Sequence, residues 1–314
     1  MVGKVGCTSI KGKPKPNQGR WRKLLHNDYD PFVPRQWHIG HGRQLEIGPK
    51  ALIMGILNVT PDSFSDGGRF DGTETAVAQA IAMVEAGADI IDVGGESTKP
   101  GAEAVDAATE QARIMPVINN LAQRGDVVIS VDTYRAHTAR MAVEAGAHIV
   151  NDVWGLQKEP EIADVVAATR SGVVIMHTGR ERQRNRDVIA DQIAFLSQSL
   201  EFANAARIAH SSIVLDPGFG FAKDNDENLE LLARFDALHS LGYPLLTGTS
   251  RKRFIGHVTG RDAQNRDIGT AATSVVARMK GSAIFRVHDV TANKDALAIA
   301  DAVISAGRTS GAGN

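Results

Sequence analysis

The chain has 314 residues, of which 43% are hydrophobic, so it is long enough for one large domain or two small ones. Its formal net charge is −1, which provides no global field to recruit nucleic acid or an anionic membrane. A single cysteine, Cys7, rules out an intramolecular disulfide, and the sequence shows no secretory signal and no run of the ~20 apolar residues needed to span a bilayer. We therefore expect a cytoplasmic protein with no nucleic-acid partner and no membrane contact.

The N-terminal residues 1–35 are rich in Lys, Arg, Gly and Pro and have no sustained periodicity, so we expect a flexible, disordered extension. Its basic character is compatible with a polyanion contact, but so short a segment favours a solvated tail. Residues 36–48 alternate apolar and polar side chains in two short runs around His41-Gly42. This pattern predicts a β-hairpin, which could plug the bottom of a barrel.

From residue 51 onward, an apolar strand, a polar loop and an Ala-rich helix repeat along the chain. The predicted strands are 51–57, 89–93, 127–131, 148–150, 172–176, 212–215, 244–247 and 283–287. The predicted helices lie near 73–86, 106–123, 135–145, 159–170, 187–208, 226–241, 265–280 and 291–306. Eight such units over 51–306 predict an α/β protein with a (β/α)8 TIM barrel, forming a single domain over 36–308 with a flexible tail over 309–314. A doubly wound open sheet is the alternative, because alternation alone does not show closure.

An internal echo supports the barrel. VEAGADIIDVGGE (84–96) and VEAGAHIVNDVWG (143–155) share a helix end, a glycine and a strand, and they begin 59 residues apart, from 84 to 143. Gly87 and Gly146 lie where a residue of positive φ should end each helix. The support is modest, because Ala-Gly is common wherever a helix leads into a strand.

Polar groups follow the buried strands throughout the chain. In ALIMGILNVTPDSFSDGGRF (51–70), the apolar run changes at Asn58 into a polar loop far longer than the usual ~2–6 residues. The other strand ends carry Asp92, Asp132, Asn151, Asp152, His177, Asp216, Arg286 and His288. Carboxylates are costly to bury without partners, so a set of them at one rim of a barrel predicts a ligand site.

The residue types indicate the kind of ligand. Carboxylates and amides suit a flat heterocycle with N–H donors and ring-nitrogen acceptors, such as a pterin. Arg286 and His288 are two residues apart, so they share one face of a strand and could clamp a diphosphate, the alternative being a surface ion pair. The sequence contains no Walker loop, dinucleotide fingerprint or zinc-spaced His/Cys cluster.

Two motifs carry a family resemblance. GILNVTPDSFSDGG (55–68) and DVGGESTKPGAE (92–103) resemble the signatures of the dihydropteroate synthases, folate-pathway enzymes inhibited by sulfonamides, and the resemblance runs from about 45 to 306. It implies a transferase that joins 6-hydroxymethyl-7,8-dihydropterin diphosphate to 4-aminobenzoate, with diphosphate leaving before the amine attacks a pterin-methyl cation. It also implies a Mg²⁺ cofactor with Asn58 as a protein ligand, and a homodimer built on the last two helices.

The resemblance also assigns site residues. The implied catalytic residues are Asp132, Lys252, Arg286 and His288. The implied pterin site contains Asp132, Asn151, Val153, Met176, Asp216, Phe221, Gly248 and Lys252, although Val153 and Met176 could equally be core residues. The implied diphosphate site contains Asn58, Thr98, Arg286 and His288. The implied aminobenzoate site contains Thr60, Pro61, Phe64, Thr98, Lys99, Pro100, Phe221, Lys252 and Arg253.

Two positions depart from the family pattern. Many relatives have SRKS where this chain has Ser250 to Arg253, and STRPG where it has Lys99. We expect the Arg253 backbone amide to keep its hydrogen bond to the aminobenzoate carboxylate, while the Arg253 side chain adds an outer cationic contact. The alternative is that the Arg253 side chain points to solvent and contributes little. The rival functions are a pterin-binding methyltransferase barrel and a catalytically silent pterin-binding homologue.

Overall fold

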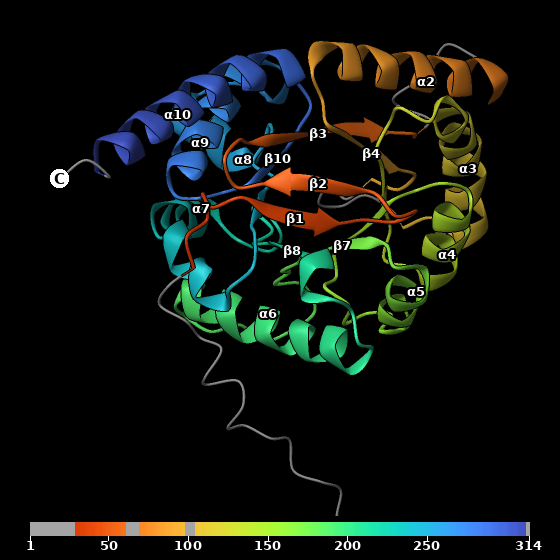
Figure 1. Ribbon diagram of the computed structural model, residues 1–314, viewed down its shortest axis with the longest axis horizontal. Helices are drawn as coiled ribbons and strands as arrows, with labels where there is room; N and C mark the ends of the chain where they lie inside the picture. Colours follow the sequence, from red (N-terminus) through yellow and green to blue (C-terminus); the bar gives the residue numbers. More distant parts are fainter. Residues whose placement is uncertain (1–28, 61–68, 98–103, 312–314) are drawn as a thin grey trace, which may run out of the picture.

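Eight parallel strands form one sheet in the computed structural model, which describes residues 29–60, 69–97 and 104–311. The strand order is β8-β7-β6-β5-β4-β3-β10-β9, so sheet neighbours are consecutive in the sequence except for β3 and β10, where the first and last strands of the ring pair. An isolated parallel bridge between Leu215 and Leu245 joins the two ends of this order. The sheet is therefore a ring with helices around it, as Figure 1 shows, and the predicted (β/α)8 barrel is confirmed over the open sheet.

The described elements follow the predicted pattern closely. The strands are β1 (Arg35–His38), β2 (Gln44–Ile47), β3 (Leu52–Asn58), β4 (Ile90–Gly94), β5 (Ile129–Asp132), β6 (Ile149–Asp152), β7 (Gly172–Met176), β8 (Ile213–Asp216), β9 (Leu246–Thr247) and β10 (Ile284–Val287). The helices are α2 (Arg69–Ala86), α3 (Ala107–Arg124), α4 (Ala136–Glu144), α5 (Glu161–Thr169), α6 (Val188–Ala205), α7 (Asn225–Ala233), α8 (Arg253–Thr259), α9 (Asp267–Met279) and α10 (Val290–Gly311). Short 3₁₀ helices are η2 (His210–Ser212), η3 (Phe235–Leu241) and η4 (Ala263–Asn265).

Helix α8 was not predicted. Its sequence, RFIGHVT, contains a glycine and β-branched residues, which are poor helix formers. Tertiary contacts stabilise it instead, because Phe254 and Ile255 are buried, and Arg266 binds the carbonyls of Arg251 and Lys252 at 3.1 and 3.3 Å. Gly256 leaves room for this contact, since a Cβ at this position would lie 2.2 Å from the Arg266 guanidinium and would displace it.

The predicted hairpin is confirmed as β1 and β2, which pair antiparallel and lie across one end of the barrel (Figure 1). Trp37 and Ile47 point into the barrel, and the Trp37 indole donates to the Ser212 carbonyl at 3.0 Å. They pack with one apolar layer from the strands: Met54, Ile90, Val128, Ile149, Val174, Val214, Leu246 and Ile284. These residues lie toward the amino ends of the strands, so the hairpin closes the amino end of the barrel.

Side chains alternate across each strand between this interior and the surrounding helices. On β4, for example, Ile91 and Val93 belong to the outer core with the helices, whereas Ile90 belongs to the interior layer. The two positions of the internal echo behave alike, since Gly87 and Gly146 both have positive φ values, 107° and 118°. Such alternation means that the residue two places after each apolar interior residue also points inward.

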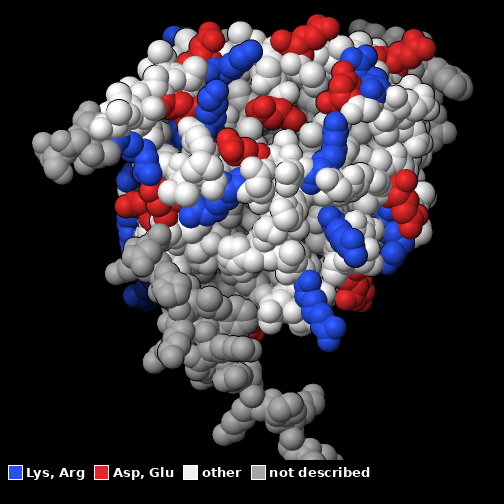
Figure 2. Space-filling model, in the orientation of Figure 1, with Lys and Arg blue, Asp and Glu red and all other residues white. Residues whose placement is uncertain are grey.

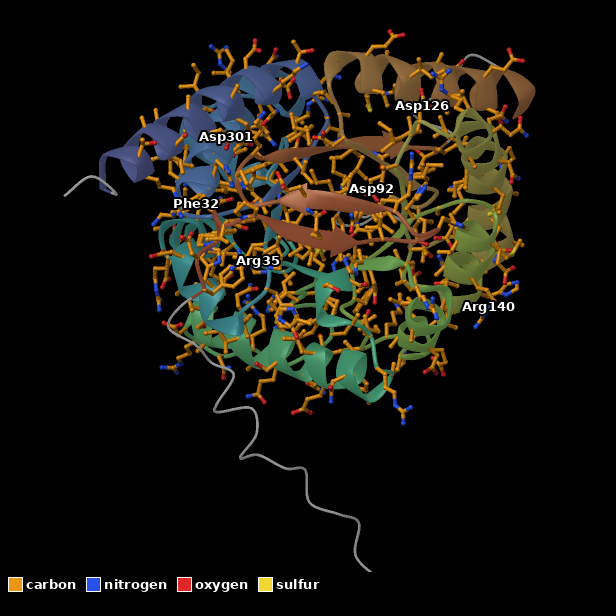
Figure 3. All side chains as sticks on the ribbon, viewed as in Figure 1. Phe32, Arg35, Asp92, Asp126, Arg140 and Asp301 are labelled. Atoms are coloured by element: carbon orange, nitrogen blue, oxygen red, sulfur yellow. The ribbon has the colours of Figure 1, made fainter. Side chains whose placement is uncertain are left out.

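The described ends of the chain meet beside α10. Asp30 forms a salt bridge with Arg308 at 2.7 Å, and the Phe32 ring lies 5.2 Å from the Arg278 guanidinium. Figure 3 shows Phe32 near α9 and α10. Helix α10 continues to Gly311, so residues 309–311, which we expected in a flexible tail, lie in the helix. Residues 1–28 and 312–314 of the expected extension and tail lie outside the described residues.

Charges of both signs are interspersed over the face that carries the hairpin, as Figure 2 shows. This distribution agrees with the net charge of −1. Among the described residues, none of the helices has the length and apolar character needed to cross a membrane.

Candidate active site

The interior of the barrel changes from apolar to polar at the next inward-facing position of several strands, two residues beyond the apolar layer. On β4 that step leads from Ile90 to Asp92, on β8 from Val214 to Asp216, and on β10 from Ile284 to Arg286. Figure 3 shows Asp92 within the ring of helices. The same step gives Asn151 on β6 and Met176 on β7. Asp92, Asn151, Asp216 and Arg286 therefore converge on one rim of the barrel, as expected from the sequence. Asp152 and His177 do not join them, because they follow the outward residues Val150 and Ile175; Asp152 accepts from the amides of Trp154 and Leu156, and His177 contacts Asp191 on α6.

Arg286 organises the charges at this rim. Its Nε donates to Asp92 Oδ2 at 2.6 Å and its Nη2 donates to Asp132 Oδ2 at 2.7 Å. The Asn151 amide donates to the same Asp92 oxygen at 3.0 Å. Asp92 and Asn151 occupy equivalent places in the internal echo, so the two copies meet in the site. The result is a half-buried cation bound to two carboxylates, formed by residues that the sequence had placed among the polar strand ends.

Burial sets the ionisation of these groups. It raises the pKa of Asp132 to about 7, against the opposing charge of Arg286. Although burial opposes it, the Asp92 and Asp132 carboxylates raise the pKa of Arg286 above its ordinary value, so the guanidinium stays charged. Asp132 is consequently a carboxylate that gains a proton close to neutral pH.

Asp216 at the end of β8, Phe221 in the loop after it and Lys252 before α8 form a second group. Asp216 Oδ1 accepts from the Gly218 amide at 2.7 Å, and burial raises the pKa of this carboxyl to about 6. Burial also lowers the pKa of Lys252 to about 8, and its Nζ lies 4.5 Å from the centre of the Phe221 ring. A carboxylate, an ammonium and an aromatic face close together suit a flat ring with both donors and acceptors.

An apolar wall stands beside these polar groups. Val153, Met176 and Phe221 pack together as a small buried cluster, separate from the main core, with Tyr134 and Trp154 against it. The wall residues implied by the resemblance therefore do lie together. Gly248 completes the surroundings of Asp216, because a Cβ on Gly248 would lie 3.8 Å from Asp216 Oδ2.

His288 directly follows β10, two residues after Arg286, and its ring contacts Ser250. Ser250 Oγ accepts from the His288 backbone amide at 3.1 Å and lies 2.9 Å from His288 Nδ1. With the ring proton on Nε2 the hydroxyl donates to Nδ1, and with the proton on Nδ1 the ring donates to the hydroxyl. Burial and the neighbouring charges of Arg286 and Arg251 lower the pKa of His288 to about 3. His288 is thus neutral at pH 7.

The structure describes only some of the other residues that the sequence places in the site. Asn58 ends β3 opposite Gly94, and Thr60 follows it, both half-buried. Arg253 is exposed as the first residue of α8. The residues Pro61, Phe64, Thr98, Lys99 and Pro100 lie outside the described residues.

Sequence reasoning gave no role to two residues of the site. Asp92 was noted at a strand end, but its contact with Arg286 joins positions 194 residues apart, which no local pattern indicates. Lys223 is buried at the end of the loop from β8 to α7, although lysines are almost never buried. The sequence had placed Asp92 among the polar strand ends of the ligand site, and its inward position on β4, two residues after Ile90, agrees with that placement.

Fold and site together define a TIM-barrel enzyme whose polar rim at the carboxyl ends of the strands suits a flat polar ring. Residues 54–288 match the family model described as "Pterin binding enzyme". Dihydropteroate synthase from Bacillus subtilis (strain 168) is 45% identical over 82% of this chain and 90% of its own length. That from Synechocystis is 44% identical over 82% of this chain and 91% of its own.

Solved structures agree. A Clostridium difficile dihydropteroate synthase determined with pteroic acid has a TM-score of 0.80 and 46% identity, covering 82% of this chain and 98% of that one. A Xanthomonas albilineans dihydropteroate synthase with 4-aminobenzoic acid has a TM-score of 0.81 and 42% identity, covering 86% and 98%. The chain belongs to the pterin-binding enzyme family, among the dihydropteroate synthases.

Proposed function

We propose that the polar rim joins 6-hydroxymethyl-7,8-dihydropterin diphosphate to 4-aminobenzoate, giving 7,8-dihydropteroate and diphosphate. The observation that carries the proposal is the Arg286 bridge between Asp92 and Asp132 at the carboxyl-end rim of the barrel, which also carries the apolar wall of Val153, Met176 and Phe221. Family membership identifies the substrates, since related structures were solved with 4-aminobenzoic acid and with 7,8-dihydropteroate.

The pterin is expected to lie against the wall of Val153, Met176 and Phe221. The Asp216 carboxylate then accepts from the 2-amino and ring N–H groups, and Lys252 donates to the ring oxygen and nitrogen. The Asn151 side-chain amide forms hydrogen bonds with the neighbouring ring nitrogens. Each of these side chains is at least half-buried before substrate arrives, so little ordering is needed on binding.

The chemical step breaks the bond between the pterin methylene carbon and the diphosphate oxygen, and the bonding electrons leave with diphosphate. Among contacts of the described residues, Nε and Nη2 of Arg286 hold carboxylates and Nη1 holds none, which makes Nη1 the group to meet the leaving oxygens. With its ring proton on Nε2, His288 adds a neutral donor. The Asp132 carboxylate stabilises the pterin-methyl cation until the amine nitrogen attacks it and loses a proton.

We also propose that Mg²⁺ assists departure of the diphosphate. The donor set fits a hydrated hard cation held mainly by substrate, since Asn58 offers one amide oxygen and the buried Asp92 Oδ1 has no hydrogen-bond partner among the described residues. No group of three His, Cys, Asp or Glu residues in the described parts of the chain could hold a metal alone. When bound, Mg²⁺ would neutralise charge on the departing diphosphate.

One assay tests the function. Product formation from both substrates is measured with Mg²⁺ and with a chelator, using Asp216→Asn as a variant that keeps the shape of the side chain. Turnover that needs both substrates and the metal supports the proposal. Pterin binding without product would favour the silent homologue instead, and transfer of a methyl group would favour the methyltransferase barrel.

Exposed apolar side chains on the last two helices support a homodimer, which we propose as the assembly. Ile268 on α9 is 87% exposed and Ile299 on α10 is 68% exposed, with Val303 beside it on the same face. An Ile299→Asp variant should become a monomer by light scattering at micromolar concentration. Leu229→Asp on α7 is the matched control, and a wild-type monomer would refute the assembly.

A sulfonamide is expected to compete with 4-aminobenzoate at this site. A Yersinia pestis dihydropteroate synthase, 41% identical over 85% of this chain, was solved with a sulfonamide drug complex. Inhibition kinetics test the proposal, because competition raises the KM for 4-aminobenzoate alone. The cytoplasmic location expected from the sequence stays a prediction.

A further inference from the structure

Lys223 is a buried ammonium that the mechanism above does not use. Only 5% of its surface is exposed. Its Nζ lies 2.8 Å from the Gly218 carbonyl, 3.5 Å from the Phe221 carbonyl and 2.9 Å from His177 Nδ1. Both carbonyls belong to the loop between β8 and α7. Lys223 therefore lies inside this loop and stabilises its backbone, including that of Phe221 in the apolar wall.

Lys223 is linked to α6 through His177. An ammonium only donates, so His177 Nδ1 accepts from Lys223. His177 Nε2 lies 2.9 Å from Asp191 Oδ2 and 2.8 Å from Arg182 Nη2, and Arg182 also binds both oxygens of Asp191. Burial lowers the pKa of His177 to about 3, in agreement with a neutral ring. Lys223 is therefore held by His177, which Asp191 and Arg182 hold in turn.

The loop itself has little room to move. Gly218 has a φ of 62°, and a Cβ there would lie 2.0 Å from the His177 carbonyl oxygen. The Gly220 amide donates to the Asn228 side chain at 2.7 Å, and the Gly179 amide donates to the Phe221 carbonyl at 3.3 Å. The Phe221 carbonyl accepts from both Lys223 Nζ and the Gly179 amide, so Lys223 is in direct contact with the backbone of Phe221.

The loop also meets Asp216 through Gly218, whose amide donates to Asp216 Oδ1. Three cations face this carboxyl from three elements: Lys252 at the start of α8, Arg286 on β10 and Lys223 in the loop. All three lower the pKa of Asp216 against the effect of burial. Burial lowers the pKa of Lys223 to about 7, against the negative charges of Asp216 and Asp191 and together with the positive charges of Lys252 and Arg182, so Lys223 is charged on the acid side of neutrality, where Asp216 takes up its proton.

We propose that Lys223 is a positioning residue of the pterin pocket. Held by the His177–Asp191 pair, its ammonium fixes the loop behind Phe221 and supplies a positive charge that keeps Asp216 ionised. Lys223 acts through these two residues and does not touch the substrate. The inference rests on the proposed function, because Asp216 and Phe221 matter only if they hold the pterin.

The test compares Lys223→Met, Lys223→Gln and Lys223→Arg, with Lys294→Met on the exposed surface of α10 as the control for a lost lysine charge. We expect the two neutral variants to raise the KM for the pterin diphosphate about tenfold while kcat changes little. The fall of kcat/KM on the acid side of its pH profile, the acid limb, should move to higher pH in both neutral variants, because Asp216 loses a positive neighbour. Lys223→Arg should restore the position of the acid limb, and Lys294→Met should match the wild type.

The decisive readout is the acid limb. A neutral variant whose acid limb coincides with that of the wild type overturns the proposal, and so does a raised KM without a shift in pH dependence. Failure of both neutral variants to fold would also overturn it, since Lys223 would then serve the fold and not the pocket. Calorimetric affinity for 6-hydroxymethyl-7,8-dihydropterin gives the same comparison without turnover, so a wild-type chain that makes no product would defeat only the proposed function.

Discussion

The two ends of the barrel interior are formed by the same strands but differ in polarity: the amino end is apolar and the carboxyl end is polar and charged. At the amino end, Ile90 of β4 belongs to an apolar layer that Trp37 of the hairpin closes. Two residues further along β4, Asp92 is fully buried and binds Arg286. The comparison teaches that one step of strand periodicity separates the layer that stabilises the fold from the layer that does chemistry. Changes at the two ends should therefore separate stability from activity.

Arg286→Ala should have the largest effect, because it removes the centre of the polar layer. Turnover should fall by about 10²-fold or more, as it does when an electrostatic donor to the transition state is lost. The change also leaves Asp92 and Asp132 buried without their cation, which should lower the free energy of unfolding by about 3–5 kcal/mol at neutral pH. Activity assays and urea unfolding measure the two effects.

Arg286→Lys is the matched variant, since it keeps one charge but cannot reach both carboxylates in the same way. It should lie between the wild type and Arg286→Ala in both measurements. The stability deficit of Arg286→Ala should shrink at lower pH, because the unpaired carboxyls then take up protons. A folded Arg286→Ala enzyme with near-normal turnover would remove Arg286 from the chemical step.

Trp37→Ala should damage the other end of the barrel. Deleting a fully buried indole usually costs about 3–5 kcal/mol of unfolding free energy, and that loss should appear in urea unfolding. The KM values for both substrates should stay close to those of the wild type. Trp37→Phe keeps an aromatic ring and loses the bond to Ser212, so it should cost less. A large rise in KM for Trp37→Ala would show that the two layers are not independent.

The sequence predicted the strands and the existence of the polar rim, because apolar runs that end in a polar group mark the carboxyl ends of buried strands. It also placed Arg286 and His288 on one face, which strand periodicity requires. It did not predict that Arg286 binds Asp92, nor that Lys223 is buried, because both depend on contacts between distant strands and loops. Helix α8 escaped prediction because packing of Phe254, and not helix propensity, stabilises it.

The polar layer should also lose function in acid before the fold fails. Asp132 and Asp216 must be ionised to act, and their pKa values are about 7 and about 6, so kcat/KM should fall as the pH drops through that range. Folded-state pKa values above those of the unfolded chain mean that protonating these two groups favours the fold. Stability is lost only when groups with lowered pKa values, such as Asp191, are protonated at lower pH.

Rates and melting temperatures measured between about pH 5 and 8 check this order. The rate should decline across the acid side of that range while the melting temperature holds. If the two curves fall together, acid inactivation is unfolding, and titration of the polar layer does not explain it.

Arg253 should give the smallest effect, because it lies at the outer edge of the polar layer. It is the first residue of α8, and its side chain is exposed. Its backbone N–H is at the start of a helix, where amides have no partner within the helix and suit a carboxylate. The guanidinium is expected to add an outer contact that depends on salt, because exposed ion pairs are weak and screened.

Arg253→Ala separates the backbone from the side chain, since it keeps the amide. We expect the KM for 4-aminobenzoate to rise several-fold, with the KM for the pterin diphosphate hardly changed, and the difference to shrink at high salt. Arg261→Ala, also exposed and in the segment after α8, is the matched control for a lost arginine. If both KM values stay at those of the wild type, Arg253 is a surface residue and the backbone amide alone holds the carboxylate. The boundary of the functional layer would then lie at Lys252, whose charge is half-buried, because a charge in open solvent contributes too little to fix a substrate.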